Sequence, residues 1–236
     1  MRLNEWLPTY RMIAKDLGLD EFLDSEAVKV LKWVTLNSDL VDDEDYAHLF
    51  QGKVTVVGNS PDVLSKIPLI DRDSTIVAAG SAASAVVSSN IPCQILVTDL
   101  DGPIGPQLEL SSRGALTFIL AHGDNTDLVR GYAGQFDGPV ILTSQVSEGT
   151  TFSCYGGFSD GDRAVCIARH FGCRHIDLAG FDYDNPSVKD GSDQARKLKK
   201  LRWARYIIED LNPPGVEIRM LRPARAYISD KDITRR

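Results

Sequence analysis

From Lys53 onward, short β-branched runs alternate with helical segments, and this alternation constrains the fold more than any other feature. Most of the runs are apolar without interruption, which is typical of strands buried on both faces of a parallel sheet. The sequence therefore predicts an α/β fold, with a doubly wound, mostly parallel sheet and flanking helices. The predicted strands cover 53–58, 74–80, 94–99, 115–123, 138–144, 175–180 and 216–221, and the predicted crossover helices 81–90, 126–134 and 161–172.

The first fifty residues have a different pattern, because no strand is predicted before Lys53. Apolar residues at helical spacing follow Asp24 and Ser25, either of which is a candidate helix cap, and the acidic segment 38–50 looks like a second helix start. We therefore expect an N-terminal helical segment over 1–50 and an α/β catalytic domain over 51–236.

Composition excludes several classes of protein. The chain has 236 residues and a net charge of −7, which argues against a nucleic-acid-binding protein with a basic face. No apolar run approaches the length of a membrane span, and the first residues are interrupted by charge and Pro8, unlike an export signal. The four cysteines show no paired spacing. We therefore expect a cytoplasmic protein with reduced thiols that binds neither nucleic acid nor membrane.

Two predicted strands end in acidic turns. The run QILVTDLDGPIG places Asp99 and Asp101 one residue apart, and the next strand ends in AHGDNTD, which adds Asp124 and Asp127. Ligands bind beyond the carboxyl ends of the strands in open α/β sheets, so we expect these turns to meet at one edge. Like charges repel each other there unless a cation joins them, and carboxylates suit Mg²⁺. The alternative is that the aspartates only cap helices and form turns.

Two further stretches are candidates for ligand contacts. The glycine-rich YGGFSDGDRAVCIA at 155–168 leads into a helix near Arg163, capped by Asp160 or Asp162, whose first N–H groups would suit a phosphate or a polar ring. The segment QARKLKKLRWARYIIEDL at 194–211 predicts a helix with a basic first half. In an acidic chain this basic cluster is a candidate for binding a nucleoside triphosphate, and the alternative is a solvated helix face.

Four motifs in this order, ILVTDLDG, AHGDN, GFSDGDRA and LAGFDYD, resemble the archaeal-type 6-hydroxymethyl-7,8-dihydropterin diphosphokinases, whose catalytic domain is similar to thiamin diphosphokinase. The resemblance covers nearly all of the α/β region up to residue 210. Two loops depart from the family pattern: GNSPD has Ser60 where a second glycine is common, and AAGSA lacks a common aspartate. The acidic turns are intact, but the roles of 58–61 and 80–82 stay unassigned.

The resemblance implies that ATP donates a diphosphoryl group to the hydroxymethyl oxygen of the pterin and that AMP is released, in the biosynthesis of folate-type cofactors or tetrahydromethanopterin. It implies ATP and the pterin as small-molecule partners, and it leaves a homodimer open. By similarity, Asp99, Asp101, Asp124 and Asp127 match acidic motifs of the related enzymes, and we expect Mg²⁺ to be held by Asp99, Asp101 and Asp124. Transfer to the hydroxymethyl group calls for an aspartate that orients or deprotonates it, and we choose Asp127, so the catalytic candidates are Asp99, Asp101 and Asp127. The remaining candidates are His122, Asn125, Lys197, Lys199 and Lys200 for ATP, and Phe158, Asp160, Asp162 and Arg163 for the pterin.

Two alternatives remain beside this resemblance. In a phosphatase of the haloacid dehalogenase type, Asp99 would be the covalent nucleophile and Asp101 the acid. The order of motifs argues against it, because HGDNTD precedes VILTS here, and Pro103 follows Gly102 where that class usually has threonine or valine. The second alternative is a regulatory module that binds a nucleotide without turnover.

Overall fold

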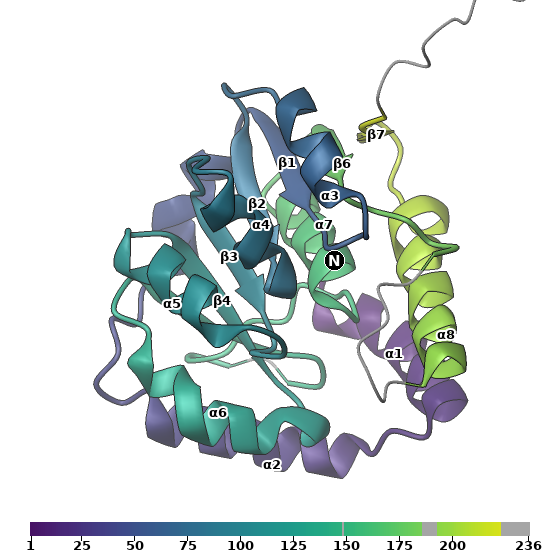
Figure 1. The fold of residues 1–236 in the computed structure, drawn as a ribbon. Helices are drawn as coiled ribbons and strands as arrows, with labels where there is room; N and C mark the ends of the chain where they lie inside the picture. Colours follow the sequence, from purple (N-terminus) through teal and green to yellow (C-terminus); the bar gives the residue numbers. More distant parts are fainter. Residues whose placement is uncertain (148, 186–192, 223–236) are drawn as a thin grey trace, which may run out of the picture.

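The computed structural model describes residues 1–147, 149–185 and 193–222. Within this part of the chain, one seven-stranded parallel sheet has the order β5-β4-β3-β2-β1-β6-β7 (Figure 1). The strands are β1 (Lys53–Val57), β2 (Thr75–Ala79), β3 (Ile95–Thr98), β4 (Leu116–Ala121), β5 (Val140–Ser144), β6 (His175–Ala179) and β7 (Glu217–Met220). The predicted parallel α/β fold and all of its predicted strands are confirmed, with small differences at the strand ends.

Both faces of the sheet are covered, which explains the uninterrupted apolar runs. Leu96 of β3 packs in the hydrophobic cluster on one face, whereas Ile95 and Val97 pack in the cluster on the other face. The first cluster is covered by α3 (Val63–Lys66), α4 (Ala83–Ser88), α5 (Ile104–Ser112) and α6 (Thr126–Tyr132), and the second by α7 (Asp160–His170). This division is the one expected of a doubly wound sheet.

Short 3₁₀ turns join several of these elements, at Ile67–Leu69, Gly80–Ala82, Gly123–Asn125 and Ala133–Gln135. The predicted basic helix is confirmed as α8 (Gln194–Arg205), which continues into a π-helical turn at Tyr206–Asp210. All four cysteines lie in the described residues and are free thiols. Along these same residues, no helix has both the length and the apolar character needed to cross a membrane.

The N-terminal segment is helical, as predicted, but the helix predicted to follow Asp24 and Ser25 begins earlier than expected. The elements are α1 (Leu3–Leu17), α2 (Glu21–Val34) and a 3₁₀ helix at Asp43–Phe50. Asp20 caps α2 by accepting a hydrogen bond from the N–H of Phe22 at 2.9 Å. The predicted caps, Asp24 and Ser25, therefore lie inside the helix. The Asp24 carboxylate is buried and makes tertiary contacts instead.

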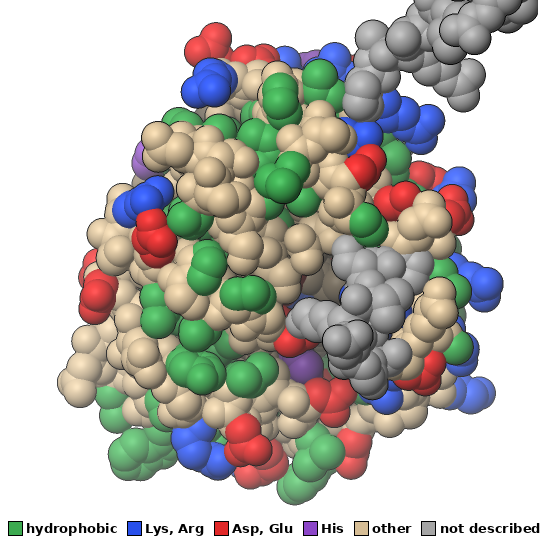
Figure 2. Space-filling model, viewed as in Figure 1, with side chains coloured by type: hydrophobic (Ala, Val, Ile, Leu, Met, Phe, Trp, Pro, Cys, Tyr) green, Lys and Arg blue, Asp and Glu red, His purple; other side chains and the backbone are tan. Residues whose placement is uncertain are grey.

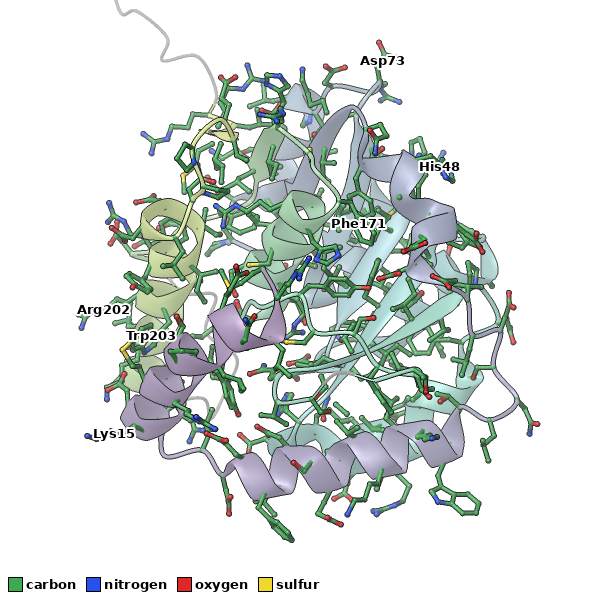
Figure 3. The ribbon with its side chains drawn as sticks, turned by 180° about the vertical axis from the view of Figure 1, so that it is seen from behind. Lys15, His48, Asp73, Phe171, Arg202 and Trp203 are labelled. Carbon is green, nitrogen blue, oxygen red and sulfur yellow. The ribbon has the colours of Figure 1, made fainter. Side chains whose placement is uncertain are left out.

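The N-terminal helices pack onto the α/β domain at two places. Helix α2 lies along α6 and shares the first hydrophobic cluster (Figure 1). Helix α1 lies against α8, where Trp203 Nε1 donates to Asp16 Oδ2 at 3.0 Å (Figure 3). Buried Trp6 and Tyr10 of α1 share a third cluster with Cys166 of α7. The N-terminal segment is thus part of the packed core.

The strand order reverses between β1 and β6, since β2 to β5 extend from one side of β1 and β6 lies on the other. The two strands part only after their last residues. A Cβ atom on Gly58 would lie 2.7 Å from the carbonyl oxygen of Gly180, so these two loops approach each other as closely as backbone allows. A reversal of this kind opens a crevice at the carboxyl ends of the strands, where ligands bind in this class of fold.

Candidate active site

Two pockets lie beyond the carboxyl ends of the strands. The switch pocket is formed at the ends of β1 and β6, by residues that include Asn59, Ser81, Asp101, Asp160, Tyr183 and Lys197. The N-terminal pocket is formed between α1, α2 and the ends of β3, β4 and β5, by residues that include Tyr10, Asp24, Asp99, His122, Asp124, Gln145, Phe158 and Lys200. Ser159 lines both, so the two pockets are neighbours. On the face shown in Figure 2, several acidic side chains lie around a histidine below the centre.

The acidic turn after β3 divides the two pockets. Asp99 lines the N-terminal pocket and Asp101 lines the switch pocket. Between them, Leu100 is buried and has a left-handed backbone, with φ of 68°, which is uncommon for a residue with a side chain. Thr98 Oγ1 accepts from the N–H of Leu100 at 2.7 Å and donates to Oε1 of buried Gln107 at 2.6 Å. This buried network holds the turn in a conformation that presents one carboxylate to each pocket.

Neighbouring loops interlock with this turn at two glycines. Gly102 has φ of 100°, and a Cβ atom there would lie 2.2 Å from Ser81 Oγ. Gly80 has φ of 49°, and a Cβ atom there would lie 2.2 Å from Asp160 Oδ2. The loop after β2 is therefore packed between the acidic turn and the start of α7. Both glycines are required by close approach as well as by backbone conformation.

The electrostatics of the site are dominated by crowded carboxylates. Burial favours the neutral form of Asp99, but the hydrogen bond and charge of His122, whose Nε2 lies 3.5 Å from Asp99 Oδ2, hold the pKa of Asp99 at about 2. The pKa of Asp160 is raised well above its usual value, first by burial and then by the negative charge of Asp99. Arg163, with Nη1 3.4 Å from Asp160 Oδ1, opposes this effect. Asp160 is therefore a buried carboxyl beside a charged carboxylate, with Arg163 as its nearest cation.

The predicted three-aspartate metal site is not formed in the described residues, where no group of three or more His, Cys, Asp or Glu side chains is arranged to hold a metal ion. Asp124 lines the N-terminal pocket with Asp99, but its carboxylate is 61% exposed and lies 3.5 Å from Nη2 of Arg196 on α8. Arg196 of the basic helix, which comes from a distant part of the sequence, thus pairs with the exposed Asp124 carboxylate. Asp99 and Asp101 remain as the paired carboxylates.

The glycine-rich loop before α7 uses its polar side chains to build itself. The helix begins at Asp160, earlier than predicted, with Ser159 as its cap. Buried Asp162 accepts from the N–H groups of Phe158 and Ser159 and from Ser159 Oγ, so its carboxylate is engaged within the capping box. Arg163 is 3% exposed, and its Nη2 donates to the Phe158 carbonyl at 3.0 Å. Asp162 and Arg163 shape the loop, whereas Phe158 and Asp160 line the pockets.

Three other predicted site residues line neither pocket. Asn125 is buried, and its amide donates to the carbonyls of Asp99 at 2.7 Å and Leu120 at 2.8 Å, which ties two strand ends together. Asp127 has a 97% exposed carboxylate that pairs with Arg130, and it lines neither pocket. Lys199 pairs with Asp16 of α1 at 3.0 Å.

The structure brings the other predicted lysines to the pockets. Lys197 lines the switch pocket, and Lys200 lines the N-terminal pocket, where its Nζ lies 5.7 Å from the centre of the Phe158 ring. One turn of α8 thus supplies a cation to each pocket, and Lys199, which lies between these two lysines, faces α1 instead.

Tyr10, Asp24 and Gln145 line the N-terminal pocket but are absent from the residues predicted from sequence. Tyr10 and Asp24 belong to the N-terminal helices, whose helical pattern carries no sign of a ligand. Gln145 follows β5 directly, and its position at a strand end is the one signal that sequence reasoning had available.

The fold and site define an α/β domain with a ligand site at its topological switch point and a carboxylate pair between two pockets. The sequence model of the 6-hydroxymethylpterin diphosphokinase MptE-like family matches residues 34–187. The chain belongs to this family, and the resemblance inferred from its motifs is confirmed.

Three curated relatives carry the name 6-hydroxymethyl-7,8-dihydropterin pyrophosphokinase. The protein from Pyrococcus furiosus is 34% identical, over 91% of this chain and 96% of its own length. The proteins from Methanocaldococcus jannaschii and Methanothermobacter thermautotrophicus are 28% and 30% identical, over 94% and 91% of this chain and 100% and 97% of their own lengths. A solved structure, MAf glycosyltransferase from Magnetospirillum magneticum AMB-1, matches 72% of this chain and 33% of its own chain, with 16% identity and a TM-score of 0.48.

Proposed function

We propose that this protein transfers a diphosphoryl group from ATP to 6-hydroxymethyl-7,8-dihydropterin. The hydroxymethyl oxygen loses its proton, which ends in solvent, and forms a bond to the β-phosphorus of ATP. The bond from this phosphorus to the oxygen that bridges to the α-phosphorus breaks, and AMP leaves. The family and the names of the three relatives support the pterin diphosphokinase activity. We infer that the product enters the biosynthesis of a folate-type pterin cofactor, and that both partners of the enzyme are small molecules.

The observation that carries this proposal is the division of the site by the acidic turn. A transfer between two substrates needs two adjoining sites, with stabilisation of charge at their junction. Asp99 lines one pocket and Asp101 the other, and Ser159 lines both. We assign ATP to the switch pocket, where nucleotides bind in doubly wound sheets, with Lys197 as a cation for its phosphates. We assign the pterin to the N-terminal pocket, with Phe158 as one wall.

Asp99 and Asp101 are the residues that would hold Mg²⁺ in this proposal. Their oxygen-only donors fit the ion, and a cation there would offset the repulsion between Asp99 and the buried carboxyl of Asp160. Two carboxylates suffice, because Mg²⁺ is usually bound by one or two carboxylates together with substrate phosphates. When bound, the ion neutralises charge on the phosphate oxygens. His122 orients the Asp99 carboxylate, with Nε2 3.5 Å from Oδ2.

The test is incubation of the purified protein with Mg²⁺, ATP and the hydroxymethyl dihydropterin, with AMP measured by chromatography. We expect AMP formation that requires all three components, and loss of turnover on the order of 10²- to 10³-fold in Asp99→Asn. Asp73→Asn is the matched control, because Asp73 lies at the opposite end of the molecule from α2, which borders the N-terminal pocket (Figure 3). Asp127→Asn tests the base implied by resemblance. The exposure of Asp127 predicts turnover near that of the native enzyme.

Other results would identify a different activity. Release of phosphate from a monoester, with a trappable aspartyl-phosphate that disappears in Asp99→Asn, would establish a phosphatase and refute the proposal. Binding of ATP without AMP formation under any of these conditions would establish a non-catalytic nucleotide-binding module.

A further inference from the structure

The N-terminal pocket contains a buried hydrogen-bond acceptor for which the described residues supply no donor. Gln145 lines this pocket and is 3% exposed. Its Nε2 donates to the Phe158 carbonyl at 3.2 Å, whereas its Oε1 is buried and, among the described residues, has no hydrogen-bond partner. A buried acceptor without a donor destabilises the protein. Its presence at a pocket points to a ligand that supplies the donor.

The position of Gln145 is built into the end of β5. Ser144 Oγ accepts from the N–H groups of Val146 and Ser147, each at 3.2 Å, so the chain turns immediately after the strand. The Phe158 carbonyl, which accepts from the Gln145 amide, also accepts from Nη2 of Arg163 on α7 at 3.0 Å. The side chain is therefore fixed from two directions, and its orientation follows from the surrounding loops.

The rest of the pocket is mixed in character. Asp24 and Asp99 bring carboxylate acceptors to it, Tyr10 and Phe158 bring aromatic rings, and His122 and Lys200 bring basic groups. The aromatic rings and acceptors match the chemistry of a flat heteroaromatic ring that carries N–H donors along one edge.

We propose that Gln145 Oε1 accepts a hydrogen bond from the amino-pyrimidine edge of the pterin and thereby selects a 2-amino-4-oxo ring. This inference rests on the proposed function, because it places the pterin in the N-terminal pocket. The 2-amino group and the adjacent ring N–H are donors side by side, and a site built to pair with donors discriminates strongly against a ring that lacks one. Gln145 is thus a specificity-determining residue that contacts substrate.

The experiment compares the native protein with Gln145→Met, which keeps the size of the side chain but removes the acceptor, and with Gln145→Glu, which keeps an acceptor. Gln51→Met, at an exposed glutamine, is the matched control. Pterin binding is measured by calorimetry without ATP, and KM values for both substrates from AMP formation. We expect Gln145→Met to weaken pterin binding about tenfold, with the KM for ATP unchanged, and Gln145→Glu to bind more tightly than Gln145→Met.

Two further measurements separate recognition from a structural role. Gln145→Met removes the unpaired acceptor and also the donor to the Phe158 carbonyl, which keeps Arg163 as a second donor. The two effects oppose each other, so its urea midpoint should stay close to that of the native protein. A pterin analogue without the 2-amino group should bind the native protein about tenfold more weakly than the pterin does, but should lose little more in Gln145→Met.

The inference is overturned if Gln145→Met binds the pterin as tightly as the native protein, if only the KM for ATP rises, or if the pterin and its analogue lose affinity equally. It is also overturned if the native protein binds no pterin. Failure of the proposed function has a different signature. The native protein then forms no AMP, while calorimetry still shows whether Gln145 distinguishes the pterin from its analogue.

Discussion

Asp24 is expected to be the main polar link between the N-terminal helices and the site. Its carboxylate is 4% exposed, Oδ1 accepts from the N–H of Gly123 at 2.7 Å, and Oδ2 accepts from the hydroxyl of Tyr10. Burial raises the pKa of Tyr10, and the hydrogen bond to Asp24 raises it further, so the hydroxyl stays protonated and donates. One side chain thus joins α1, α2 and the loop after β4.

The expected cost of Asp24→Ala follows from these two bonds. A hydrogen bond to a charged group contributes about 1.5–3 kcal/mol, and removal of the carboxylate leaves two donors unpaired. Because Asp24 lines a pocket that water can enter, the lower end applies, and we expect a loss of about 3 kcal/mol in the free energy of unfolding. Asp24→Asn keeps an acceptor for Gly123 and a partner for Tyr10, so about 1 kcal/mol is expected.

The assay is urea unfolding followed by circular dichroism, with Glu26→Ala as the matched control, since Glu26 lies on the same helix in an exposed ion pair with Lys29. The control should change the free energy of unfolding by less than about 0.5 kcal/mol. Tyr10→Phe combined with Asp24→Ala completes a double-mutant cycle that measures the coupling between Tyr10 and Asp24. A change in Asp24→Ala no larger than in the control would refute the reasoning.

Two further predictions concern the acidic turn and pH. Gln107→Leu removes the acceptor for Thr98 from the buried network under the turn, so we expect a loss of about 2 kcal/mol in urea unfolding and at least tenfold slower AMP formation; unchanged turnover would show that the turn holds itself. The hydrogen bond and charge of Lys53, whose Nζ lies 2.7 Å from Asp71 Oδ2, lower the pKa of Asp71 below 3.8. The ionised Asp71 carboxylate therefore contributes to stability above pH 3.8, and this contribution is lost as pH falls through the lowered pKa. In Lys53→Met, an NMR titration should show that the pKa of Asp71 has moved back toward 3.8.

The sheet and the main acidic turn could be predicted because their signals are local. A strand buried on both faces must be apolar at successive positions, so the runs that form β1 to β6 can be recognised in the sequence. Asp99 and Asp101 stand out because two carboxylates one residue apart, directly after such a run, serve no purpose in packing. The rule that ligands bind at the carboxyl ends of strands then predicted that they belong to the candidate site.

Tertiary structure alone decided which other polar residues reach the pockets. Asp124 and Asp127 belong to one motif, yet the first lines the N-terminal pocket and pairs with Arg196, whereas the second is solvated on α6. Asp24 looked like a helix cap, but its partner Gly123 lies 99 positions away. A side chain's local sequence determines its secondary structure, whereas its partners depend on how distant elements pack. This packing is a cooperative property of the whole core, which no short stretch of sequence contains.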